Sequence, residues 1–450
     1  MPDASLPIVP IGHPLQAVVR VPGSKSLTNR ALLIAALAEG TTRLTNALFS
    51  DDSRYFAGAL KTLGFDLQLD EEQAEMTVTG LGGRIPARKA ELFIGNAGTA
   101  ARFLSAFLTL GNGEYILDGD ARMRERPIGD LVETLEQLGA TVEPVNPKSK
   151  IKNRKSIAPP IKIAESGLPG GTASIAGDIS SQFLSALLMV APYAQNPVTL
   201  NLSTELNSKP YVDMTIAVMQ DFGVEVQRKG YESFSVPLTH YPGPDRQGQG
   251  VLRTSIYPIE SDASAASYFF AAPAILGGTV CVENISRRSK QGDMAFLNVL
   301  AQMGCMVAEG SNFIEVSGPT QLLRGVDVDM CDIPDTAQTL AAIAPFASGP
   351  TRIRGIASAR VKETDRVAAM CAELSRLGVD VEEHPDGLTI QPCAAIHPAT
   401  VQTYNDHRMA MAFALVGLRA PGVSIENPGC VSKTFPNYFE VLDQLRHPIH

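Results

Sequence analysis

The chain has 450 residues, 47 of them acidic and 38 basic, and its formal net charge is −9. A hydrophobic fraction of 44% with 19% charged residues is typical of a globular protein of two or three domains and excludes a wholly disordered chain. The absence of tryptophan, the aromatic content of only 6% and the acidic balance argue against nucleic-acid binding.

Neither a membrane span nor a secretory signal is expected. The sequence has no run of 18 apolar residues, and its N-terminus has neither a basic nor an apolar region. The six cysteines all lie from Cys281 onward, without ligand-like spacing to histidine, which indicates reduced thiols. We therefore expect a cytoplasmic protein with no metal, no other cofactor and no membrane partner.

A pattern recurs along the chain: a helical stretch ends in an apolar residue and a glycine, and a short alternating strand follows. Each glycine is expected to end its helix in the left-handed conformation. The glycines are 74–84 residues apart: Gly64, Gly139, Gly223, Gly304 and Gly378. This period is too long for a solenoid and fits six subdomains of βαβαββ size. The sixth falls at the C-terminus, where the helical pattern at 438–446 ends without its strand.

Three motifs of the first half are candidate anion sites. Residues 22–30 (PGSKSLTNR) precede an apolar helix pattern at 31–37, so exposed N–H groups and the charges of Lys25 and Arg30 would form an anion cradle. A capped helix start with two surface cations explains this motif equally well, and the spacing is not that of a Walker P-loop. Similar small residues open a helix at 95–102 (GNAGTAAR), and three arginines alternate at 120–127 (DARMRERP).

Further along, a basic segment at 147–160 predicts an exposed loop. Residues 177–183 (GDISSQF) bring hydroxyls and an amide to a helix start, which alone is an ordinary cap. Stretches rich in proline and glycine at 10–22 and 241–258 predict linkers.

The second half adds charged motifs at 361–366 (VKETDR), 404–411 (YNDHRMAM) and 432–436 (SKTFP). On a helix, Lys362 and Arg366 would share a face. Asp335 could be a plain N-cap, and His407 a structural histidine. Together, cations at helix starts in both halves of an acidic protein indicate a cleft for multiply charged anions, where Lys and Arg supply the charge that Mg²⁺ supplies in kinases.

Taken in order, these motifs, together with NSKPYVDMT at 207–215, resemble the 5-enolpyruvylshikimate-3-phosphate synthase family from Pro22 to Phe439. The resemblance implies a mixed α/β fold, a two-domain inside-out α/β barrel with three βαβαββ repeats per domain and the active site in the interdomain cleft. The domains would be 22–258 and 1–21 plus 259–450, with hinges near 21–22 and 258–259. The family expectation is a monomer.

The implied reaction transfers the enolpyruvyl group of phosphoenolpyruvate to the 5-hydroxyl of shikimate 3-phosphate and releases phosphate, on the pathway to chorismate and the aromatic amino acids. By resemblance, Asp335 is the general base at the 5-hydroxyl, Glu363 protonates C3, and Lys25 shares the acid–base work. Arg102 is expected to support the 95–102 helix from behind.

The implied binding residues form two sets. Those for shikimate 3-phosphate are Lys25, Ser26, Arg30, Ser180, Ser181, Gln182, Ser208, Tyr211, Asp335, Ser358 and Lys362. Those for phosphoenolpyruvate are Lys25, Asn96, Gly98, Thr99, Arg122, Gln182, Arg366, Arg408 and Lys433.

The chain departs from the family pattern at two of these motifs. Phe103 replaces a usual proline and is expected to affect how the inhibitor glyphosate fits, although Gly98 itself is present. Ser358 replaces an asparagine and weakens one expected contact to shikimate.

Two alternatives stay open at this stage. A UDP-N-acetylglucosamine enolpyruvyl transferase would keep the fold and donor, but those enzymes usually have Lys-Asn where this chain has Lys25-Ser26, and a cysteine in a mobile loop. No cysteine precedes Cys281. A non-catalytic anion-binding protein would need neither Asp335 nor Glu363.

Overall fold

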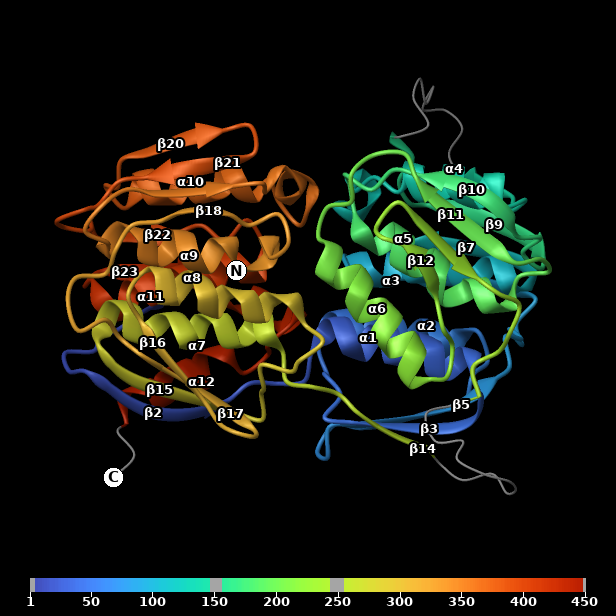
Figure 1. Cartoon of the computed structure of the whole chain (residues 1–450), viewed down its shortest axis with the longest axis horizontal. Helices are drawn as coiled ribbons and strands as arrows, with labels where there is room; N and C mark the ends of the chain where they lie inside the picture. Colours follow the sequence, from blue (N-terminus) through green and yellow to red (C-terminus); the bar gives the residue numbers. More distant parts are fainter. Residues whose placement is uncertain (1–4, 146–155, 243–254, 448–450) are drawn as a thin grey trace. The chain divides into compact units, whose positions relative to one another are not determined.

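The computed structural model describes residues 5–145, 156–242 and 255–447. Most of the segments expected to be a basic loop (147–160) and a linker (241–258) lie outside these residues. The chain divides into two compact units (Figure 1): unit 1 comprises residues 1–22 and 260–450, and unit 2 comprises residues 23–259. Each unit has an apolar core of its own.

Unit 2 contains three copies of a βαβαββ subdomain, each with one four-stranded mixed sheet. The first has α1 (Lys25–Leu37), β3 (Glu39–Thr45), α2 (Asp51–Thr62), β4 (Leu67–Asp70), β5 (Glu75–Leu81) and, as its first strand, β14 (Ser255–Pro258). The second has β6 (Lys89–Phe93), α3 (Gly98–Phe107), β7 (Asn112–Asp118), α4 (Gly129–Gln137), β8 (Val142–Pro144) and β9 (Ile161–Ser166). The third has β10 (Gly171–Ile175), α5 (Ser181–Val190), β11 (Val198–Leu202), α6 (Lys209–Asp221), β12 (Gln227–Lys229) and β13 (Ser233–Val236).

Unit 1 repeats the design. Its first subdomain has β2 (Leu15–Arg20), α7 (Ala263–Leu276), β15 (Gly278–Glu283), α8 (Phe296–Gln302), β16 (Met306–Glu309) and β17 (Phe313–Ser317). The next has β18 (Asp327–Asp329), α9 (Ala337–Ile343), β19 (Thr351–Arg354), α10 (Arg366–Arg376), β20 (Val381–His384) and β21 (Gly387–Ile390). The last has β22 (Ala399–Val401), α11 (His407–Arg419), β23 (Val423–Glu426) and α12 (Tyr438–Asp443).

Among the residues that the structure describes, no strand follows β23 in the sixth copy, and a strand from the first residues of the chain joins its sheet instead. Strand β1 (Ser5–Pro7) pairs antiparallel with β23, which completes a three-stranded sheet. The described strands thus form six small mixed sheets and close into no single barrel.

The predicted helix-ending glycines are confirmed. All five have positive φ, between +82° and +104°, which is the region where glycine avoids the steric cost of a Cβ atom. A Cβ on Gly64, Gly139 or Gly223 would also lie only 2.7–2.9 Å from a proline side chain that packs against the turn. At these three positions the glycine is therefore required by both the backbone conformation and the close packing, whereas at Gly304 the nearest atom would be 3.5 Å from the Cβ and only the conformation favours glycine.

In each unit three helices are buried along nearly their whole length: α1, α3 and α5 in unit 2, and α7, α9 and α11 in unit 1. Buried helices are expected to be largely apolar, and most residues of these six helices are apolar, with polar side chains concentrated towards their first turns. Their buried bodies leave the helix starts as the places where polar side chains gather.

Candidate functional site

Four helix starts of unit 2 carry predicted binding residues. Ser24 caps α1 ahead of Lys25 and Ser26, and Ser180 caps α5 by accepting from the Gln182 N–H. Gly98 and Thr99 open α3, and Ser208, with φ of +57°, precedes α6. The Gln182 side chain donates to Thr99 Oγ1 at 3.4 Å, which joins the starts of α5 and α3. Helix starts with free N–H groups attract anions.

Arg30 ties three of these helices together. Arg30 as a whole is 2% exposed, and its guanidinium donates to Thr215 Oγ1 at 2.7 Å, to the Tyr211 carbonyl at 3.2 Å and to Ser185 Oγ at 3.4 Å. A further bond reaches the Ser26 carbonyl in its own helix. Burial lowers the pKa of Arg30 to about 10. The predicted residues Ser26, Arg30 and Tyr211 are therefore held in one hydrogen-bonded group.

Lys25 is held by a carboxylate that the sequence did not single out. Its Nζ lies 3.5 Å from Oδ2 of Asp52, whose side chain is only 3% exposed. Asp52 sits in the first turn of α2, a favourable place for a negative charge.

A cation packs against the predicted Gly98 turn, and it is Arg126. Its Nη1 donates to Asn96 Oδ1 at 2.8 Å and to the Asn96 carbonyl at 3.1 Å, and a Cβ on Gly98 would clash with its Nη2. Behind the turn, buried Arg102 donates to the Gly98 carbonyl at 3.1 Å. Arg122, the arginine predicted for this site, instead lies near the surface and pairs with Glu125 at 2.9 Å.

Unit 1 contains a buried charge cluster centred on Arg366. The Arg366 side chain is 2% exposed and contacts three carboxylates: Asp406 at 2.7 Å, Glu363 at 2.9 Å and Asp335 at 3.1 Å. Although burial by itself lowers the pKa of Arg366, these carboxylates raise it above its usual value. Arg366 thus stays charged in an otherwise dry environment.

Asp335 is paired with three cations of this cluster. Besides Arg366 it contacts Arg408 Nη2 at 2.8 Å and lies 3.6 Å from Lys362 Nζ. It belongs to a 3₁₀ turn (Pro334–Thr336) before α9, and its carboxylate faces these cations. On the other side, Lys433 Nζ lies 4.0 Å from Glu363 Oε1.

No single helix spans residues 362–366, so Lys362 and Arg366 do not share a helix face. Residues Ala357–Val361 form a 3₁₀ segment, η8, which contains Ser358, and α10 begins only at Arg366. Asp365 is the N-cap of α10 and accepts from the Ala368 N–H, so its own backbone is extended and not helical. Lys362 and Arg366 still meet at Asp335, because η8 and α10 both approach the 3₁₀ turn that carries it. Burial lowers the pKa of Lys362.

Two side chains of unit 1 join the cluster without having been assigned a role. Asp406, fully buried, caps α11 and holds Arg366 through both oxygens. Tyr268 of α7 is also fully buried, and burial raises its pKa to about 12 against the opposing effect of Arg408. His407 is buried as well, with Nδ1 3.6 Å from Asp406. An aspartate directly before an apolar helix was the available signal for Asp406; nothing local in the sequence marks Tyr268.

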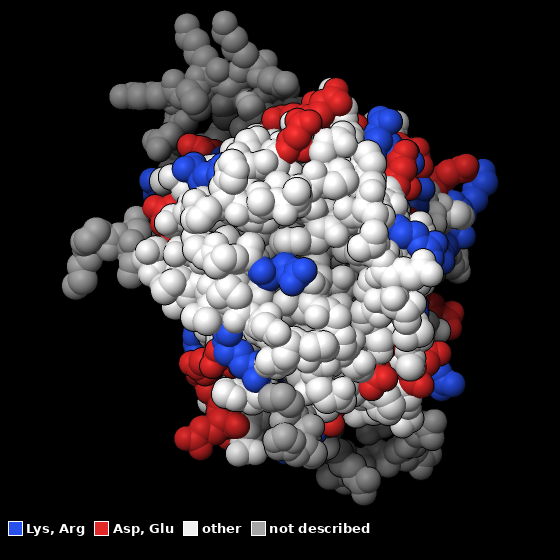
Figure 2. All heavy atoms as spheres, turned by 90° about the vertical axis from the view of Figure 1, so that its left-hand side faces the viewer, with Lys and Arg blue, Asp and Glu red and all other residues white. Residues whose placement is uncertain are grey.

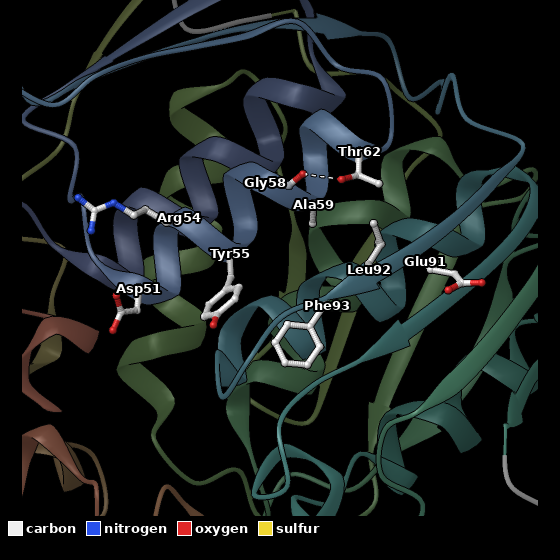
Figure 3. Close-up of a pocket in the computed structure, with 9 residues that line it drawn as sticks. All are labelled: Asp51, Arg54, Tyr55, Gly58, Ala59, Thr62, Glu91, Leu92 and Phe93. Atoms are coloured by element: carbon white, nitrogen blue, oxygen red, sulfur yellow. Dashed lines mark hydrogen bonds between the residues drawn. The ribbon is translucent and has the colours of Figure 1, made fainter. Parts of the chain in front are cut away.

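A surface pocket of about 570 Å³ lies elsewhere, between α2 and β6 (Figure 3). Tyr55 and Phe93 line it, with ring centroids 6.0 Å apart, and none of the predicted binding residues does. Figure 2 shows one face of unit 1 on which charged side chains gather mainly towards the edge. Neither feature has the concentration of cations found at the helix starts.

Within the described residues, no group of three or more His, Cys, Asp or Glu side chains could hold a metal ion. In the same ranges no helix is long and apolar enough to cross a membrane.

The geometry can be compared with known proteins. The family model for EPSP synthase (3-phosphoshikimate 1-carboxyvinyltransferase) matches residues 9–442. The chain belongs to the EPSP synthase family. A 3-phosphoshikimate 1-carboxyvinyltransferase of Nostoc punctiforme is 50% identical over 98% of this chain and 99% of its own length. One from Vibrio atlanticus is 48% identical over 96% of this chain and 98% of its own.

Solved structures agree with the EPSP synthase assignment. An EPSP synthase from Acinetobacter baumannii matches with a TM-score of 0.77 and 25% identity, covering 98% of both chains. The enolpyruvyl transferase NikO of Streptomyces tendae, at 18% identity, covers 99% of this chain and 98% of its own with a TM-score of 0.72, and so shares the fold.

Proposed function

We propose that this protein transfers the enolpyruvyl group of phosphoenolpyruvate to the 5-hydroxyl of shikimate 3-phosphate and releases phosphate. Family membership over nearly the whole chain supports the reaction. The observation that supports specific residue roles is the Arg366 cluster. There, Asp335 and Glu363 are held among Lys362, Arg366, Arg408 and Lys433.

The chemistry has two steps, an addition and an elimination, and each step needs two proton transfers. As the 5-hydroxyl oxygen bonds to C2 of phosphoenolpyruvate, Asp335 takes the hydroxyl proton and Glu363 gives a proton to C3. In the resulting tetrahedral intermediate, the C2–O bond to phosphate then breaks and phosphate leaves with that electron pair. The departing phosphate takes up the proton that Asp335 had received, and C3 returns its proton to Glu363, so both carboxyl groups regain their starting states. The products are the enol ether and inorganic phosphate, with all atoms accounted for.

The cations have a second task in this proposal. In the free protein the carboxylates of Asp335 and Glu363 form ion pairs with these cations. Substrate phosphate and carboxylate groups would take over these cations, since charge-assisted contacts to anions are the strong ones. Asp335 would then be released from its ion pairs at the moment when a base is needed.

Unit 2 would supply the remaining contacts. Ser26, Arg30, Ser180, Ser181, Ser208 and Tyr211 are proposed for shikimate 3-phosphate. For phosphoenolpyruvate we propose Arg126 in place of Arg122, because Arg126 is the buried arginine against Gly98 and Asn96. Lys25, Asn96, Gly98, Thr99 and Gln182 keep their predicted roles, and Ser358 remains a predicted contact to shikimate.

The test is phosphate release from phosphoenolpyruvate with each acceptor in turn and no added metal. Release with shikimate 3-phosphate but not with UDP-N-acetylglucosamine is expected. Release only with the UDP-sugar would overturn the acceptor and keep the carboxylate roles, and release with neither would indicate a binding-only protein. Light scattering during chromatography would test the further expectation of a monomer, and fractionation of cells would test the cytoplasmic location.

A further inference from the structure

Phe103 lies at the point where the chain departs from the family pattern, and the structure places its ring against Arg30. The Arg30 guanidinium carbon lies 5.3 Å from the centroid of the Phe103 ring. Phe103 is completely buried and Arg30 is 2% exposed. This distance is within the range of a cation–π contact, which is strongest when both groups are desolvated.

The partners of Arg30 make this contact unusual. Its hydrogen bonds in the described part of the chain all go to neutral oxygens: two hydroxyls and two backbone carbonyls. By contrast, the buried Arg366 contacts three carboxylates. A carboxylate beside Arg30 would neutralise it and compete with an anionic ligand, whereas an aromatic face attracts the cation and leaves its positive charge in place.

Helix α2 packs against the Phe103 ring that contacts Arg30. The Phe56 ring meets Phe103 edge to face, with centroids 6.5 Å apart. Asp52, one helical turn before Phe56, contacts Lys25. Residues four apart share one face of a helix, so the same face of α2 supports both predicted cations of α1, one through a carboxylate and the other through two rings.

We propose that Phe103 is a positioning residue that fixes the Arg30 guanidinium and preserves its charge for the acceptor substrate. This inference rests on the proposed function, because it takes Arg30 as a contact of shikimate 3-phosphate. Loss of the ring should therefore weaken binding of the acceptor, while binding of phosphoenolpyruvate should change little.

The test compares Phe103→Leu with Phe107→Leu. Phe107 lies one turn further along α3, is equally buried, and packs its ring against Phe65 instead. We expect Phe103→Leu to raise the KM and the calorimetric Kd for shikimate 3-phosphate roughly 3- to 30-fold, with the KM for phosphoenolpyruvate within about twofold and kcat little changed. Phe107→Leu should lower stability similarly and leave both KM values unchanged. Equal effects of the two variants on the acceptor KM would overturn the proposal.

A second variant tests the charge distribution of the ring without the cavity that Phe103→Leu creates. Site-specific replacement of Phe103 by 3,4,5-trifluorophenylalanine weakens the negative face of the ring and nearly keeps its shape. The acceptor KM should rise as in Phe103→Leu, and an unchanged KM would show that the ring acts by packing alone.

A double-mutant cycle, measured on the stability of the ligand-free protein, tests this inference separately from the proposed function. Arg30→Met, which removes the cation, is combined with Phe103→Leu and, as control, with Phe107→Leu, and urea midpoints are followed by circular dichroism. We expect non-additive shifts for the first pair and additive shifts for the second. If the wild-type protein released no phosphate but the cycle showed this coupling, the proposed function would fail and the contact would stand. Additive shifts for both pairs would refute the contact itself.

Discussion

The charge cluster of unit 1 makes a quantitative prediction about burial, because two aspartates there have the same local role in different surroundings. Asp406 caps α11 and binds Arg366, and both side chains are at most 2% exposed. Asp365 caps α10 and binds Arg360 at 3.0 Å, but these side chains are 41% and 24% exposed. Each aspartate is an N-cap with an arginine partner, so asparagine can preserve the cap at both positions.

Asp406→Asn should cost far more stability than Asp365→Asn. Removing one partner of a buried ion pair costs about 3–5 kcal/mol, whereas an exposed pair contributes about 0–1 kcal/mol. In Asp406→Asn the amide would also present a donor towards Arg366 Nε or towards the Arg408 N–H, whichever way it turned. For a unit of about 200 residues, the expected fall in Tm is roughly 6–20 °C for Asp406→Asn and at most about 4 °C for Asp365→Asn.

Scanning calorimetry is the suitable assay, because the two units can unfold separately and the chain has no tryptophan to report on either one. Only the transition of unit 1 should move. Equal losses in the two variants would refute the argument that burial sets the energy of these pairs. A loss confined to activity would show that Asp335 and Glu363 compensate fully for the missing charge.

Three further predictions concern turnover and are checked by steady-state kinetics. Asp335→Asn should lower kcat at least about 100-fold and leave both substrates bound, since it removes the proposed base; unchanged phosphate release would exclude that role. Arg126→Ala should raise the KM for phosphoenolpyruvate about tenfold or more, while Arg122→Ala, exposed and paired with a neighbouring glutamate, should change it less than about twofold. Gly98→Ala should also raise the KM for phosphoenolpyruvate about tenfold and spare that of the acceptor, because its methyl group displaces Arg126; the opposite selectivity would place Arg126 at the other substrate.

The sequence was sufficient for features that depend on local order. A glycine after an apolar helix end has a definite conformational meaning, so five helix ends and the repeat itself could be predicted. The strands that complete three of the sheets could not be predicted from local pattern, because β1, β2 and β14 reach their sheets from distant parts of the chain. Strand exchange of this kind leaves no local pattern.

The arginines at alternate positions show a second limit. The sequence showed three arginines at alternate positions but not which of them is buried. A 3₁₀ turn at Met123–Glu125 changes the periodicity, and Arg126 turns inward while Arg122 stays near the surface. The 362–366 segment shows a related limit. A spacing of four residues predicts a shared face only within a helix, and Asp365 acts as a cap before the helix begins.

Lys362 illustrates how a cation in the proposed anion site lowers the stability of the folded protein. Its side chain is 28% exposed and lies near Asp335, yet burial and the neighbouring Arg366 and Arg408 outweigh that attraction and lower its pKa. The unfolded chain therefore binds this proton more tightly, which destabilises the folded state at every pH below the folded pKa.

Lys362→Met should accordingly stabilise the ligand-free protein by roughly 1 kcal/mol, or about 2–4 °C in Tm. The same substitution should abolish binding of the acceptor. The advantage over wild type should shrink as the pH rises from the lowered folded pKa towards 10.5, where the lysine loses its charge in both states. Paired unfolding curves at neutral and alkaline pH measure this difference directly. A variant less stable than wild type at neutral pH would mean that the ion pair with Asp335 outweighs desolvation, and that the cluster is built for stability as much as for binding.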